Sequence, residues 1–437
     1  MYLSTRIDKA LFPTAALFFV YFLVMVWVNN SYAYFLHEYM GAAQKNVDFE
    51  FVSYLAILAA YCSFLCSSKI RTPGDLVVVL LILVLVPHAL VLNGANSFAP
   101  EASPFSGVPL AVLLGVSLVG LSNKIHFYER DSGEDGRRYI VLLASINIAV
   151  LIFIVLKSLG HFSLDFSGQY IRRALARDVF AAGSPSGYIA SIGTQAFFPV
   201  LFAWGVYKKS SFYFFLGLLN VLVLWGAFGQ KYPFFVLVLI YLLMMYFRRH
   251  GQIKTAWLLF FAIGFLLLGV VEHEITDYSY INDYFVRRAF VVPSSLLGVA
   301  DLFASNNVNN GYSDTLIGVL LGSERSDPLS FQMGVSIFNN PDLNANVNFL
   351  AISYLQLKYL GVLFEASFVG GVVVLLNYLY ACRGSFLAIP VALLFATKIL
   401  EQSLPTVMLG SGVSFMLLFL VLIAAPPQRR ATGSPQQ

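Results

Sequence analysis

The run LVVVLLILVLVPHALVLN, residues 76–93, decides the class of fold. His88 is its only ionisable side chain. As a helix, the run would be about 27 Å long, close to the roughly 30 Å thickness of a bilayer hydrocarbon core. The run therefore predicts a transmembrane helix. His88, which follows Pro87, is expected to be a buried hydrogen-bonding residue rather than a catalyst.

Similar apolar runs recur along the whole chain. The 437 residues are 58% hydrophobic and include 40 Phe and 24 Tyr, and the mean hydropathy is +0.75. These values exclude an ordinary soluble domain, and the alternation typical of outer-membrane strands is absent. We expect an all-α polytopic integral membrane protein, with residues 1–437 forming a single membrane domain. The sequence predicts about twelve transmembrane helices, at 11–29, 51–66, 76–93, 107–122, 139–159, 193–207, 212–229, 233–247, 255–271, 360–380, 386–402 and 406–425.

Basic residues concentrate in alternate connecting segments. If the N-terminus is cytoplasmic, the cytoplasmic segments contain 16 of the 27 Lys and Arg residues, as the positive-inside rule requires. Both termini are then cytoplasmic, and the polar stretch 426–437 is expected to be a disordered tail. We expect contacts with membrane lipids and no nucleic-acid partner. The 16 residues are Arg6, Lys9, Lys69, Arg71, Lys124, Arg130, Arg137, Arg138, Lys208, Lys209, Arg248, Arg249, Lys254, Arg383, Arg429 and Arg430.

Two arginine clusters contradict this charge bias. They fall in the two longest connections on the opposite side, residues 160–192 and 272–359. The first cluster lies in QYIRRALARDVFAAG, residues 169–183, and the second in DYFVRRAFVVPSSLLG, residues 283–298. In each segment an arginine is separated by ten residues from a glycine, as the pairs Arg172 with Gly183 and Arg287 with Gly298 show. Long loops in compact proteins are usually functional or disordered.

Arginine is well suited to binding phosphate or carboxylate groups. Its guanidinium is planar, permanently charged and able to donate two parallel hydrogen bonds. If the first segment is helical, Arg173 and Arg177 share a face one turn apart, and Arg172 points about 100° away. The alternative is that these arginines only contact lipid headgroups. Two similarly spaced clusters favour a specific anion site.

Eight segments between residue 27 and residue 395 resemble the O-antigen polymerases of the Wzy type. The duplicated arginine–glycine spacing in two outer loops belongs to the same resemblance. The segments are WVNN, VPHALVLNGAN, RRALARDVFAAGS, SIGTQAFFPVLFAWGVY, LWGAFGQKYPF, NDYFVRRAF, FNNPDLNANVNF and IPVALLF.

The resemblance implies a GT-C-like protein of the bacterial inner membrane with up to fourteen spans and an active site facing the periplasm. It implies a glycosyltransferase that moves a growing polysaccharide from undecaprenyl diphosphate onto a lipid-linked repeat unit, in lipopolysaccharide biosynthesis. Its substrates would be undecaprenyl-diphosphate-linked donor and acceptor oligosaccharides. A chain-length regulator (a polysaccharide co-polymerase) and a flippase are the partners that the resemblance implies.

The lipid diphosphate would leave with negative charge, which fixed arginines can stabilise. Arg172 and Arg287 are therefore candidate catalytic residues. A base is also needed to accept the proton of the attacking hydroxyl. Glu272, His273 and Asp283 are candidates, although a carboxylate beside an arginine is more often its ion-pair partner. His161 and Asp165 are weaker candidates.

Further polar residues are candidates for substrate binding. Lys231 follows Gly229 at a tight turn between two spans, and the asparagines of FNNPDLNANVNF could bind sugar hydroxyls or simply form turns. No Asp-x-Asp triplet occurs in the chain, so we expect a metal-independent enzyme without a cofactor. The candidate binding residues are Arg173, Arg177, Gly183, Arg288, Gly298, Lys231, Asn344 and Asn346.

Two other functions remain open. A lipid-linked oligosaccharide flippase or another transporter would suit about twelve spans, but transporters place charged residues near the bilayer midplane. An O-antigen ligase would transfer the polymer to the core of lipid A, and the doubled motif favours a polymerase over it. Lys398 and Glu401, three residues apart, are expected to form an ion pair.

Overall fold

The chain folds almost entirely into helices. The computed structural model describes residues 2–3, 11–35, 41–98, 103–105, 107–127, 137–166, 168–181, 184–306, 310–315, 318, 320, 322–324, 326–341 and 343–424. The expected tail at 426–437 and the candidate Gly183 lie outside the described residues.

The first part of the chain alternates long helices with short π-helical segments (η) and two-residue strands. These elements are β1 (Tyr2–Leu3), α1 (Leu11–Val28), η1 (Asn29–Ala33), α2 (Phe49–Leu65), β2 (Lys69–Ile70), α3 (Pro73–Val86), η3 (Pro87–Val91), α4 (Gly107–Ser122), β3 (Ile125–His126), α5 (Arg137–Ser158), α6 (Gln169–Val179), α7 (Pro185–Ile192), η4 (Gly193–Phe197) and α8 (Phe198–Lys208).

The second part of the chain continues in the same way. Its elements are α9 (Ser211–Phe228), α10 (Tyr232–His250), β4 (Ile253–Lys254), α11 (Thr255–Thr276), η5 (Asn282–Val291), α12 (Val292–Asn306), α14 (Leu329–Phe338), α15 (Phe349–Arg383), α16 (Ala388–Ile399), η6 (Thr406–Gly410) and α17 (Val413–Ile423).

Local sequence explains several helix boundaries. Thr72 and Asp75 form a capping box at the start of α3, where Pro73 occupies the first helical position. This arrangement satisfies backbone N–H groups that have no partner within the helix. At the other end of the same apolar run, His88 is buried and its Nε2 lies 2.5 Å from the backbone oxygen of Ala289. The expectation of a buried, hydrogen-bonded His88 is therefore confirmed.

Nine helical stretches in the described part of the chain are long and apolar enough to cross a membrane. The all-helical, polytopic character expected from the sequence is therefore supported, while the number twelve stays a prediction. Five shorter apolar helices accompany the nine.

Two stretches differ from the sequence interpretation. The span expected at 193–207 begins at Pro185, because η4 continues α7 into α8 without a break. Residues 282–306, interpreted as part of an outer loop, form a helical stretch of 25 residues. That stretch buries Val291, Leu297 and Val299, which accounts for its order inside the expected loop.

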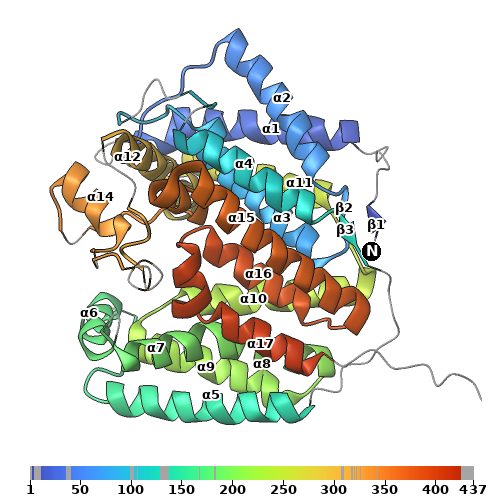
Figure 1. The fold of residues 1–437 in the computed structure, drawn as a ribbon, viewed down its shortest axis with the longest axis vertical. Coiled ribbons are helices and arrows are strands. Elements are labelled where there is room, and N and C mark those ends of the chain that lie inside the picture. The colour runs from blue at the N-terminus through green and yellow to red at the C-terminus, as the bar shows by residue number, and fades with distance from the viewer. Residues whose placement is uncertain are drawn as a thin grey trace, which may run out of the picture.

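Figure 1 shows two groups of helices with α16 between them. The upper group contains α1 to α4, α11, α12 and α15, and the lower group contains α5 to α10 and α17. Helix α16 packs on α3 and α15 from the upper group, and on α8, α10 and α17 from the lower group. The lower group carries the first arginine cluster and the upper group carries the second.

The two arginine clusters nevertheless lie at the same end of the bundle. In Figure 1, α6, α12 and α14 occupy the left end, and η5 packs on α12. The opposite end carries β1 and β3, which pair with each other, and β2, which pairs with β4. Lys69 of β2 faces Lys254 of β4 in that pairing. The basic residues assigned to the cytoplasm at β2 and β4 thus lie far from both arginine segments.

Helix α15 is broken near its start. Leu357 and Lys358 leave the helical conformation, with φ of −138° and 52°, so carbonyl groups of the preceding turn lose their helical partners. The backbone N–H of Gly311 donates to the oxygen of Gln356 at 3.1 Å, and the N–H of Asn310 donates to the oxygen of Leu355 at 3.3 Å. The segment 310–312 therefore satisfies carbonyls that would otherwise be costly to bury.

A buried carboxyl group lies beyond this break. Glu365 is only 1% exposed, and its Oε1 accepts a hydrogen bond from the hydroxyl of Tyr312 at 2.9 Å. No lysine or arginine in the described part of the chain forms an ion pair with it. The sequence interpretation did not single out Glu365. It is the only acidic residue in LGVLFEASFVGG, residues 360–371.

The contact between α8 and α9 depends on a missing side chain. A Cβ added to Gly205 would lie 2.5 Å from the backbone nitrogen of Phe214, and that backbone cannot move without disturbing α9. We expect Gly205→Val to lower the free energy of unfolding by about 1–3 kcal/mol, measured by denaturant titration in mixed micelles. Gly264→Val in α11 is the control, because nothing lies within 4 Å of its added Cβ. Equal stability of the two variants would contradict the packing.

Candidate anion site

Helix α6 presents its arginines on two faces. Arg172 and Ala176, four residues apart, are buried against the bundle, whereas Arg173 and Arg177 are exposed. The helix packs on α9 and α5. The helical spacing expected from the sequence therefore exists, and it separates the cluster into one buried arginine and two arginines that face open space.

Two contacts partly offset the cost of burying Arg172, whose Nε has no hydrogen-bond partner among the described residues. It is 3% exposed, its Nη2 donates to the backbone oxygen of Asp165 at 2.5 Å, and its guanidinium lies 5.2 Å from the ring centroid of Trp225. Trp225 itself donates from Nε1 to the backbone oxygen of Leu164 at 2.9 Å. These contacts tie the segment before α6 to α9. Arg172 is a positioning residue and does not line the cavity described next.

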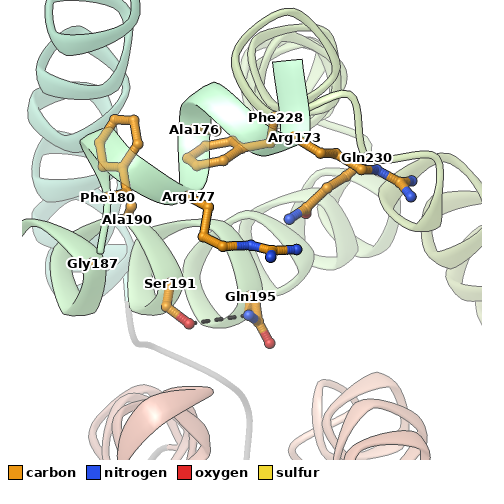
Figure 2. A pocket seen from close by; sticks show the side chains of 10 residues that line it. All are labelled: Arg173, Ala176, Arg177, Phe180, Gly187, Ala190, Ser191, Gln195, Phe228 and Gln230. Carbon is orange, nitrogen blue, oxygen red and sulfur yellow. Dashed lines mark hydrogen bonds between the residues drawn. The ribbon is translucent and has the colours of Figure 1, made fainter. Parts of the chain in front are cut away.

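A cavity of about 400 Å³ lies beside the exposed face of α6. Figure 2 shows the Arg177 side chain extending between Gln230 on one side and Ser191 and Gln195 on the other. Arg173 donates from Nε to the backbone oxygen of Gly229 at 3.3 Å, which holds it at the rim. Polar and aromatic side chains that line the cavity include Arg173, Arg177, Ser191, Gln195, Phe228 and Gln230.

The far wall of the cavity is polar and ordered by hydrogen bonds. Ser191 donates from Oγ to the backbone oxygen of Gly410 at 2.7 Å, and Gln195 donates from Nε2 to Ser191 at 3.0 Å. Gln195 Oε1 is buried and accepts no hydrogen bond from the described residues. These hydrogen bonds therefore fix the positions of Ser191 and Gln195 in the wall.

The charge of the cavity is positive and uncompensated. Its lining contains two arginines and no aspartate or glutamate. Within the described part of the chain, neither Arg173 nor Arg177 forms an ion pair with a carboxylate. Two guanidinium groups without a carboxylate partner favour an anionic ligand such as a phosphate or carboxylate. Lys231, at the start of α10, is exposed and does not line the cavity.

The second arginine cluster has a different environment. Arg287 lies 2.7 Å from Asp283, Nη2 to Oδ1, and also donates from Nε to the backbone oxygen of Asp283 at 3.1 Å. Tyr278 donates to the other carboxylate oxygen at 2.5 Å, and this hydrogen bond raises the pKa of Tyr278 to about 12. Asp283 is thus the ion-pair partner of Arg287. Arg288 is exposed and forms no ion pair with a described residue.

The two candidate bases at the end of α11, Glu272 and His273, are held in structural contacts. Glu272 accepts hydrogen bonds from the Ser279 hydroxyl and from the backbone N–H of Ile281, both at 2.9 Å. His273 packs edge-on against Tyr32 with ring centroids 4.8 Å apart. Neither Glu272 nor His273 lines the arginine cavity. Both side chains help to fix the turn between α11 and η5 and its contact with η1.

The remaining candidates fall at separate places. Gly298 is buried in α12, where an added Cβ would lie 2.3 Å from Oδ1 of Asn96, so the glycine permits close packing of two segments. Asn344 and Asn346 are exposed in the stretch before α15. His161 and Asp165 precede α6, where Asp165 contributes its backbone oxygen to Arg172.

The two arginine clusters do not form one site through direct packing of their helices. Helix α6 packs on α5 and α9, whereas η5 packs on η1, η3, α11 and α12. Among the described residues, no group of three or more His, Cys, Asp or Glu side chains is arranged to hold a metal ion. The cavity beside α6 is therefore the strongest candidate site, and an anion is the ligand that its lining favours.

Sequence reasoning missed Gln195, Gln230 and Ser191. Gln195 had a signal, because it is an amide within SIGTQAFFP, an otherwise small and apolar stretch. Ser191 and Gln230 had none, since their role depends on the approach of α7 to the turn between α9 and α10.

Replacing Arg172 is expected to weaken the fold. Arg172→Leu loses the hydrogen bond to Asp165 and the contact with Trp225, so the free energy of unfolding should fall by about 2 kcal/mol. Arg177→Leu, on the exposed face of the same helix, should change it by less than about 0.5 kcal/mol. Denaturant titration of both purified variants checks this. A fully stable Arg172→Leu protein would show that the buried guanidinium does not support α6.

The pair Asp283–Arg287 is expected to be energetically coupled. Both side chains are 17% exposed, so Asp283→Asn and Arg287→Gln should each cost about 0.5–1 kcal/mol. A double-mutant cycle measures whether the combined variant costs less than the sum of the two. Strict additivity would mean that Asp283 and Arg287 do not stabilise each other. Asp283 would then be a stronger candidate for the base.

The geometry thus combines one buried, structural arginine with two arginines that face a cavity free of carboxylates. No protein-family model, no curated protein and no solved structure matches this chain.

Proposed function

We propose that this protein is an O-antigen polymerase of the Wzy type, a glycosyltransferase that extends a polysaccharide carried on undecaprenyl diphosphate. The observation that carries the proposal is the cavity beside α6. It presents Arg173 and Arg177 without a carboxylate and lies at the same end of the bundle as the second arginine cluster. A diphosphate linked to a sugar fits a site that combines two guanidinium groups with side-chain amides.

The proposed reaction is a displacement at the anomeric carbon of the donor sugar. A hydroxyl of the acceptor repeat unit attacks that carbon, the new glycosidic bond forms, and the bond to the diphosphate oxygen breaks. Negative charge develops on the departing diphosphate, where Arg177 and Arg173 would stabilise it. The acceptor proton passes to a base, for which Glu272, His273 and Asp283 stay candidates although none lines the cavity.

Several finer expectations belong to this proposal. They are a GT-C-like arrangement with up to fourteen spans, a location in the bacterial inner membrane, cytoplasmic termini and an active site facing the periplasm. A chain-length regulator and a flippase are proposed as partners. The shared end of the two arginine segments, opposite β2 and β4, supports the sidedness.

A second candidate function is the transport of a lipid-linked oligosaccharide. One observation favours it: Glu365 is a buried carboxyl group close to the break in α15, and broken helices with buried ionisable residues are typical of transporters. The arginine cavity, by contrast, is explained by the proposed glycosyltransferase reaction without a transport step. The two functions differ in the products that accumulate when the protein fails.

The decisive variants are Arg177→Ala and Arg177→Lys. In a strain that lacks the native gene, Arg177→Ala should reduce the surface polysaccharide ladder to a single repeat unit, because losing one charge-stabilising donor costs about 10²–10³ in rate. Lysine keeps the charge but not the fork, so it should restore short chains only. The ladder is read on a gel at matched protein levels.

Arg138→Ala, an exposed arginine at the start of α5, serves as the control and should keep the full ladder. A full ladder with Arg177→Ala would refute the proposed site. Loss of the single-repeat band as well would place the defect before polymerisation and support the transport function.

A further inference from the structure

A second cavity adjoins the arginine cavity. It has a volume of about 210 Å³ and shares Gln195 and Gln230 with the first cavity. Its walls are largely apolar and come from the starts of α8 and α10 and from the end of α16. Phe198, Val236 and Leu394 are among these residues.

One cation enters this apolar cavity. Lys398 lines it, and its Nζ lies 4.7 Å from the ring centroid of Tyr232. The close ion pair with Glu401 expected from the sequence is absent among the described residues, although the Glu401 carboxylate still interacts electrostatically with Lys398 over a longer distance. Instead, the face of Tyr232 holds the ammonium at the cavity wall. The ammonium therefore lines the cavity with no carboxylate of the described residues in direct contact.

Together the two cavities have the polarity of an amphiphile. One end offers two guanidinium groups, the junction offers two side-chain amides, and the other end offers one ammonium on an apolar wall.

We propose that the two cavities form one site for a prenyl-type lipid diphosphate, and that Lys398 is the specificity-determining residue that recognises the second phosphate. This inference rests on the proposed function and deepens it. Arg173 and Arg177 bind the phosphate next to the sugar, Lys398 binds the phosphate next to the lipid, and the first carbons of the chain lie along Val236 and Leu394. A lipid monophosphate would engage only one of the two cationic ends.

The test compares farnesyl diphosphate with farnesyl monophosphate, both water-dispersible probes, in titrations of the full-length protein in detergent. The wild-type protein should prefer the diphosphate by about tenfold, the value of one charge-assisted hydrogen bond. Lys398→Gln should remove this preference while leaving the affinity for the monophosphate unchanged. Lys157→Gln is the matched control, because Lys157 is an exposed lysine of α5 that lines neither cavity.

Substitutions of Tyr232 supply an independent measurement. Tyr232→Phe keeps the aromatic face and should keep the preference, whereas Tyr232→Leu should reduce it. A preference that survives Lys398→Gln would overturn the inference, as would equal wild-type affinity for both probes. Competition by inorganic diphosphate at the same concentration as farnesyl diphosphate would also overturn it, because the apolar wall would then contribute nothing.

The same titrations separate this inference from the proposed function. Arg177→Ala should weaken the binding of both farnesyl probes, because it removes the end of the site that both ligands need. If Arg177→Ala leaves both affinities unchanged, the arginine cavity is not the phosphate site and the proposed function fails with it. If only the effect of Lys398→Gln is missing, the arginine cavity stands and the role of Lys398 alone is refuted.

Discussion

The buried guanidinium of Arg172 is the contact on which the candidate site depends. A permanent charge removed from water is expensive unless polar or aromatic groups replace the solvent, and Asp165 and Trp225 provide both. Because the hydrogen bond comes from the segment before α6 and the aromatic face comes from α9, burial of one side chain fixes the position of the whole short helix. Its exposed face then has a single orientation, toward α7 and the turn after α9.

That orientation explains why neighbouring arginines take different roles. Arg172 is bound by protein groups and cannot serve a ligand without releasing α6. Arg177, one turn and one residue further along, faces a cavity without a carboxylate. The second cluster lacks this division, since Arg287 is paired with Asp283 in the described structure. A ligand at that cluster would have to compete with Asp283, whereas a ligand beside α6 meets free charge.

Features set by neighbours in the sequence could be predicted, and features set by distant contacts could not. The apolar run around His88 and the shared face of Arg173 and Arg177 follow from helical period alone. The break in α15 depends on segment 310–312, which supplies donors for the freed carbonyls, and no local signal reveals it. The same holds for Lys398: spacing suggested Glu401 as its partner, but Tyr232, from another helix, holds the ammonium. Contacts between a cation and an aromatic ring on another helix have no characteristic spacing in the sequence.

The break in α15 also bears on how the chain is made. Segment 310–312 precedes α15 in the sequence, so the ribosome completes it before Leu355 and Gln356 emerge. The N–H donors for the two carbonyls that lack helical partners therefore already exist when the broken helix enters the bilayer. Those carbonyls need not stay without hydrogen bonds in the hydrocarbon. If segment 310–312 followed α15 in the sequence, the two carbonyls would remain without hydrogen bonds in the lipid until that segment was synthesised. Chain order thus protects an irregular helix during biogenesis, the stage at which it is most exposed to misassembly.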